Sequence, residues 1–128
     1  MAYYLTKKLD CGFAEAIERA KEALKTEGFG VLCEIDVQRT LKEKLGADFY
    51  PYIILGACNP SYAHRALQAE DKIGLMLPCN VIVQEREPGL VEVSAVDPLE
   101  SMRAVDNPRL LEVALEVQGK LNRVIEGL

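Results

Sequence analysis

Apolar residues recur along this chain with two different spacings, which divide it into nine elements. Alternating or continuous apolar runs predict strands, and apolar residues three to four positions apart predict helices. The expected strands cover 2–9, 29–37, 50–58, 79–87 and 90–97, and the expected helices cover 12–27, 38–45, 59–70 and 107 onward. The predicted order is therefore β-α-β-α-β-α-β-β-α.

Three of the helices have clear apolar faces or ends. The first is expected to bury Phe13, Ile17, Ala20 and Leu24 and to end at Gly28. The last is capped by Asn107-Pro108, and its apolar stripe is Leu110, Ala114, Val117, Leu121 and Val124. The short helix 38–45 is expected to turn Leu41 and Leu45 inward and to stop at Gly46.

The strands differ in how much of each face they bury. In 29–37 the alternation places Val31, Cys33, Ile35 and Val37 on an inner face, with Glu34 and Asp36 on a solvated one. The run 50–58 is almost continuously apolar, as in a strand covered on much of both faces. Pro88-Gly89 marks a hairpin, and 73–77 is either a turn of helix or a loop packed on the core.

One domain is expected, because no linker, repeat or low-complexity segment interrupts the 128 residues. The economical arrangement is a two-layer α+β sandwich, with a mostly antiparallel sheet and helices on one face. An exposed sheet face or edge in such a domain is a ready dimerisation surface.

Charge and composition exclude several classes of function. The net charge of −5 argues against nucleic-acid binding, which needs a basic surface. The apolar runs are far shorter than the roughly 20 residues of a membrane-spanning helix, and residues 1–10 lack the apolar centre of a cleavable signal. The four cysteines lie far apart in an apparently cytoplasmic chain, where reduced thiols are the expected state.

The sequence Cys58-Asn59-Pro60 stands where a strand runs directly into a helix. Asn59 is expected to cap that helix by accepting from the N–H of Ser61 or Tyr62. Pro60 suits the first helical position. Cys58 would then lie near the positive end of the helix dipole, which lowers a thiol pKa. The alternative is that Cys58 is simply a small apolar residue at the end of a buried strand.

The same Cys-Asn pair opens another strand at Cys79-Asn80. Asn80 has no helix to cap, so its amide needs a polar partner or a ligand if it points inward. Cys58 and Cys79 meet the first condition for a reversible disulfide only if their Cα atoms lie within about 7 Å. We expect no metal and no cofactor, because structural zinc sites favour closely spaced cysteines and His64, the only histidine, is expected in solvent.

Glu34 and Asp36 are the best candidate pair of catalytic carboxylates. Two carboxylates on one strand face can act as acid and base. A solvated sheet face explains them equally well, and no nucleophile accompanies them in the sequence. Tyr50 and Tyr52 are candidates for lining a pocket, although aromatic residues in such a strand usually belong to the core.

Several motifs together resemble those of the DUF302 family. They are Gly28-Phe29-Gly30-Val31, the run 40–46, Gly56-Ala57-Cys58-Asn59-Pro60, Leu77-Pro78-Cys79-Asn80-Val81 and Val96-Asp97-Pro98. The resemblance extends over about residues 3–126. It implies a two-layer domain of the TATA-box-binding-protein-like class and a homodimer, and it implies no established reaction. The fold analogy to a DNA-binding protein carries little weight for an acidic chain.

These motifs support three functional hypotheses. The leading one is a cytoplasmic, homodimeric domain that binds a small polar or anionic ligand at Cys58, Asn59, Pro60, Cys79 and Asn80, because unpaired backbone donors are available there. The second is thiol redox chemistry, with Cys58 as the reactive thiol and Cys79 as its resolving partner. The third is a structural module that binds a partner protein at a sheet edge.

Overall fold

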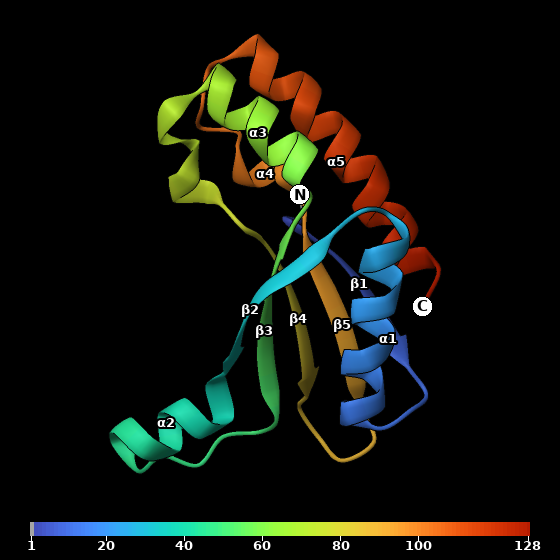
Figure 1. Cartoon of the computed structure of the whole chain (residues 1–128). Helices are drawn as coiled ribbons and strands as arrows, with labels where there is room; N and C mark the ends of the chain where they lie inside the picture. Colours follow the sequence, from blue (N-terminus) through green and yellow to red (C-terminus); the bar gives the residue numbers. More distant parts are fainter. Residues whose placement is uncertain (1) are drawn as a thin grey trace.

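Five strands form one antiparallel sheet in the computed structural model, which describes residues 2–128 (Figure 1). Their order across the sheet is β1-β5-β4-β3-β2. The strands are β1 (Tyr4–Leu9), β2 (Gly30–Asp36), β3 (Tyr52–Cys58), β4 (Cys79–Glu85) and β5 (Val91–Val96). The helices are α1 (Phe13–Thr26), α2 (Val37–Leu45), α3 (Pro60–Ala69), the 3₁₀ helix η1 (Asp71–Met76), α4 (Pro98–Ser101) and α5 (Pro108–Glu126).

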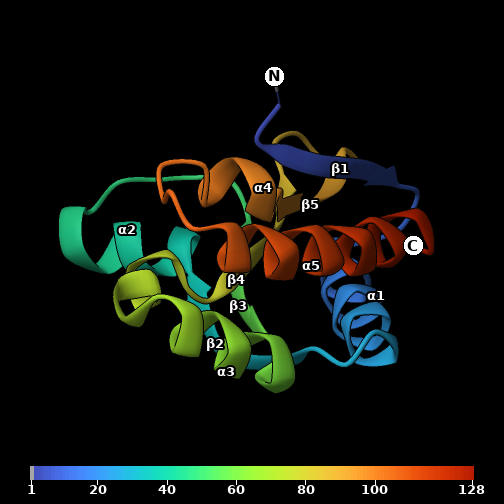
Figure 2. The same cartoon turned by 90° about the horizontal axis from the view of Figure 1, so that it is seen from above.

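The core lies between one face of the sheet and a layer of helices. Helices α1 and α5 contact the sheet, and Figure 2 shows α5 crossing the molecule with α1 and α3 beside it. The five residues of the expected α5 stripe are all buried, and so are the alternate residues Val81 and Val83 of β4. The two-layer α+β sandwich is therefore confirmed, and its sheet is entirely antiparallel.

Most of the expected helix ends are also confirmed. Gly28 (φ 85°) and Gly46 (φ 65°) follow α1 and α2 in the left-handed conformation that glycine favours. The Asn107 side chain accepts from Arg109 N–H at 3.0 Å at the start of α5. Helix α4 was not predicted, although Asp97-Pro98 carries the same signal: the Asp97 carboxylate accepts from Leu99 N–H at 3.0 Å.

The expected burial pattern of β2 is wrong because the strand contains a β-bulge. Val31 is opposite Ala57 and Cys33 is opposite Gly56, so Leu32 is an extra residue that reverses the faces of the later residues in the strand. Cys33 is consequently exposed. Glu34 is exposed as expected, but it lies on the helix side of the sheet, where its carboxylate accepts from Lys21 Nζ of α1 at 3.1 Å.

The expectation for α2 is wrong as well. None of its residues is buried, and Leu45, expected to face inward, is 75% exposed. Figure 1 shows the reason: α2 lies at the opposite end of the sheet from α3, beyond the helix layer. The segment 73–77 behaves as expected, since Ile73 of η1 is buried in the core.

In the described part of the chain, no helix packs across the other face of the sheet (Figure 1). It carries half-buried or exposed apolar side chains, including Ile54, Ile82 and Tyr52. Phe49, Tyr50 and Tyr52 form an aromatic cluster, with the Phe49 and Tyr50 ring centroids 4.1 Å apart. A shallow hollow of about 520 Å³ crosses this open face. Among residues 2–128, no helix combines the length and apolar content that a membrane span requires.

Candidate functional site

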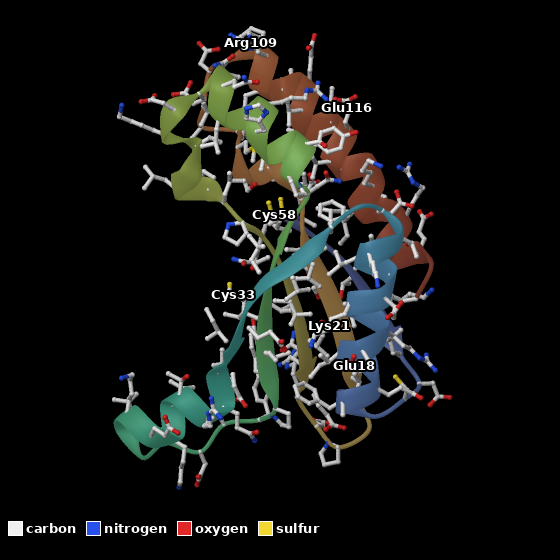
Figure 3. All side chains as sticks on the ribbon, in the orientation of Figure 1. Glu18, Lys21, Cys33, Cys58, Arg109 and Glu116 are labelled. Carbon is white, nitrogen blue, oxygen red and sulfur yellow. The ribbon has the colours of Figure 1, made fainter. Side chains whose placement is uncertain are left out.

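A cavity of about 300 Å³ lies where the end of the sheet meets α3, α4 and α5. Figure 3 places Cys58 at this junction, between the strands below and the helices above. The walls come from several separate parts of the chain, between Phe29 and Val117, and they are almost entirely apolar. No lysine, arginine, histidine, aspartate or glutamate lines the cavity. Its chemistry is therefore that of an apolar site with two thiols, one amide and one tyrosine hydroxyl.

Strand pairing brings the cysteines of the two Cys-Asn motifs to this cavity. Ala57 of β3 is the register partner of Cys79 of β4, so Cys58 at the end of β3 lies beside the start of β4. Pro60 begins α3 immediately afterwards and turns the chain over the cavity. The cavity thus depends on β3 ending, and α3 beginning, within two residues.

Asn59 occupies the expected cap position but does not cap α3 with its side chain. Its Nδ2 donates instead to the backbone carbonyl of Glu27 at 3.2 Å. A Cβ on Gly28 would come within 3.0 Å of this amide. The prediction that Asn59 bonds Ser61 or Tyr62 is therefore wrong: the amide joins the start of α3 to the turn after α1, because a glycine there leaves room.

Charged residues close the outer rim of the site. The Glu27 carboxylate lies 3.0 Å from Arg123 Nε and 3.8 Å from Lys120 Nζ, both on α5. Arg65 of α3 pairs with Glu116 of α5 at 2.8 Å, and its guanidinium lies 5.4 Å from the centre of the Tyr62 ring. The Glu27 contacts join the end of α1 to α5, and the Arg65 pair joins α3 to α5. The charges stay outside the cavity.

The two thiols of the cavity have different environments. Cys58 is half-buried, whereas Cys79 is only 8% exposed. Burial, and secondarily the nearby Cys58, raise the pKa of Cys79 to about 11. Cys79 is therefore protonated at neutral pH, which makes it a poor attacking group. All four cysteines are free thiols.

The structure brings together three of the five residues expected in a ligand site. Cys58, Asn59 and Cys79 line the cavity, whereas Pro60 is exposed outside its lining. Asn80 is exposed on the open face of the sheet, opposite Gly56. The paired motifs therefore mark one cavity but do not form one continuous binding surface.

Sequence reasoning missed most of the cavity wall. Phe29, Tyr62, Met102 and Val117 line it and come from four different segments. Val117 was recognised only as part of the α5 stripe. The apolar character of these residues indicates burial, but nothing in their local sequence shows that they surround a common space.

Tyr50 and Tyr52, candidates for lining a pocket, line the shallow hollow on the open face of the sheet. The acidic pair and His64 have structural roles or lie in solvent. Glu34 pairs with Lys21, and the Asp36 carboxylate caps α2 by accepting from Arg39 N–H at 3.0 Å. These partners account for the acidic pair. His64 is exposed, as expected. Within residues 2–128, no three His, Cys, Asp or Glu side chains form a group suited to a metal ion.

Comparisons with known proteins agree with one another. Residues 5–128 match the family described as "Domain of unknown function DUF302". The chain is also similar to the crystal structure of an uncharacterized conserved DUF302 protein from Bacillus stearothermophilus, with 35% sequence identity and a TM-score of 0.90 over 98% of both chains. No curated protein matches. This chain, with its two-layer sandwich and its Cys-Asn motifs at one cavity, belongs to the DUF302 family.

Proposed function

We propose that this chain is a binding domain for a small, largely apolar molecule. One observation carries the proposal: an apolar cavity of about 300 Å³ lies at the junction of the sheet and the helix layer. Concave, mainly apolar spaces with a few polar groups are the usual form of small-molecule sites. The polar groups here are the Asn59 amide and the Tyr62 hydroxyl, beside the thiols of Cys58 and Cys79.

The wall favours an apolar ligand over the polar or anionic one expected from the motifs. An anion needs a cation or several free donors, and no basic side chain lines the cavity. Asn59 already donates to Glu27. The basic residues Arg65 and Lys120 lie on the Tyr62 ring at the rim.

The environment of Cys79 favours small-molecule binding over thiol redox chemistry as the proposed function. A resolving cysteine must form a thiolate, and the raised pKa of Cys79 opposes this at neutral pH. Redox exchange between Cys58 and Cys79 remains the alternative activity. We retain a cytoplasmic location in the proposal, since four free thiols suit a reducing compartment.

Titration with N-phenyl-1-naphthylamine, a neutral apolar fluorophore, tests the proposal. Ala63 lines the cavity, so Ala63→Phe should fill part of it and weaken probe binding about tenfold or more, equivalent to 1.4 kcal/mol. The neighbouring His64 is exposed, and His64→Phe adds the same ring on the solvent side. Equal binding by both variants, or none by the unmodified protein, would refute an apolar site here.

We further propose that the open face of the sheet binds a second copy of the chain. Five strands about 20 Å long and about 4.8 Å apart present roughly 500 Å². Helix α2, which buries no residue of its own, adds apolar surface such as Leu45 beside this face. Together they approach the ~800 Å² that each partner contributes to a typical stable interface.

A further inference from the structure

Three sulfur-containing side chains line the same cavity, and apolar ligand binding requires none of them. They are Cys58, Cys79 and Met102. Cys79 and Met102 are 8% and 7% exposed, and Cys58 is half-buried. The other two cysteines, Cys11 and Cys33, do not line the cavity. Two of the four cysteines therefore share one cavity with a methionine.

The fold explains why these side chains converge. The pairing of Ala57 with Cys79 brings the last residue of β3 next to the first residue of β4. Met102 follows α4, whose first residue Pro98 also lines the cavity. Figure 3 shows Cys33 further along β2, away from Cys58. Two thiols and a thioether therefore come from three separate segments.

The donor set selects a narrow class of ion. Thiolate and thioether sulfur are soft ligands that favour Cu(I), whereas Mg²⁺ and Ca²⁺ require oxygen ligands. No carboxylate or imidazole lines the cavity. A structural zinc site normally requires four nitrogen or sulfur ligands, of which only two thiols are available here. An ion satisfied by two or three sulfur ligands fits best.

We propose that the sheet side of this cavity binds one soft monovalent metal ion of the Cu(I) type. The sulfurs of Cys58 and Cys79 are its main ligands, and Met102 is a weaker third. On binding, two S–H bonds break and two S–Cu bonds form. Both protons pass to solvent and copper remains Cu(I), so the ion with its two thiolates carries one net negative charge. Because no basic side chain lines the cavity, the S–Cu bonds themselves must offset the cost of burying that charge. This site goes beyond the proposed function, since an apolar molecule needs no such ion.

Anaerobic titration of the reduced full chain with Cu(I), in competition with bicinchoninate, tests the inference. One Cu(I) per chain should leave the chelator. X-ray absorption at the copper edge should then show sulfur neighbours only. Retention of all copper by the chelator, or nitrogen or oxygen as the main ligands, would overturn the proposal without any variant.

Serine variants assign the ligands. Loss of an outer-shell partner alone costs about 10–100-fold in metal affinity, so loss of a direct ligand in Cys58→Ser should cost about 100-fold or more. Cys11→Ser and Cys33→Ser are matched controls and should bind normally. Unchanged affinity in Cys58→Ser would contradict the assignment. Cys58 is half-buried, so this variant also avoids the folding risk of changing buried Cys79.

The proposals of apolar-ligand binding and of Cu(I) binding in this cavity can be refuted independently. Binding of the naphthylamine probe without Cu(I) binding would remove the metal site and leave the proposed function. Binding of Cu(I) without the probe would do the reverse.

Discussion

The adjacent residues Cys79 and Asn80 point to opposite faces of the sheet. Cys79 is buried beside the cavity, whereas Asn80 is exposed on the open side of the sheet. Successive side chains of a strand point to opposite faces, so a dipeptide within a strand cannot direct both side chains to one pocket. At Cys58-Asn59 the chain leaves the strand for a helix, and both residues line the cavity.

Burial of Cys79 predicts a loss of stability at alkaline pH. Its pKa is raised from 9.0 to about 11, so between these values the folded chain holds a proton that the unfolded chain releases. The free energy of unfolding should therefore fall as pH rises from 9 to 11, by up to about 3 kcal/mol, with no such effect below pH 9. Urea unfolding from pH 8 to 11 should show a smaller fall for Cys79→Ala.

A Cys33→Ala control removes an exposed thiol instead. If it changes the alkaline slope as much as Cys79→Ala does, burial at position 79 is not the cause.

Helix α3 buries little of its own surface in the core. Ala66 is its one buried residue within the described chain, and Leu67 is 44% exposed. Two polar contacts add to its packing: the Asn59 side chain donates to the Glu27 carbonyl, and Arg65 pairs with Glu116 of α5. Polar contacts of this kind contribute less than buried apolar area.

The Asn59 contact can be separated from helix capping. Aspartate is as good an N-cap as asparagine, but its carboxylate cannot donate to the Glu27 carbonyl. Asn59→Asp should therefore lower the free energy of unfolding by about 1 kcal/mol or more. Chemical denaturation measures this, with Asn80→Asp as the exposed control, expected within about 0.5 kcal/mol of the parent. If Asn59→Asp leaves the free energy of unfolding unchanged, the capping interpretation would be restored.

Helices and strands could be predicted from the sequence where a regular apolar spacing corresponds to a single buried face. The α5 stripe is the clearest case. The buried and exposed faces of β2 could not be predicted. A single extra residue, Leu32, exchanges the two faces, and the local sequence does not indicate this bulge. Helix α2 failed for another reason: its apolar spacing is real, but spacing does not say whether a partner surface exists. The cavity was located at Cys58 and Cys79, while its remaining walls depend on contacts distant in sequence.

At the scale of the whole molecule, the uncovered face of the sheet is the surface through which we expect the chain to form dimers. Ile82 lies on this face, opposite Ile54. Ile82→Lys should place a charge in the proposed interface and convert dimers to monomers, as measured by light scattering after gel filtration. Leu111 is exposed on α5, away from the sheet, so Leu111→Lys is the control. A monomeric parent protein, or a dimer that tolerates Ile82→Lys, would contradict this interface.

The small buried surface of α3 has a dynamic consequence. A helix that buries one residue opens locally at a much lower free energy than that of unfolding the whole domain, whereas α5 buries seven residues. Backbone amide hydrogens of α3 should therefore exchange with solvent faster than those of α5. A molecule bound in the cavity contacts α3 and would slow that exchange, so hydrogen exchange would report occupancy directly.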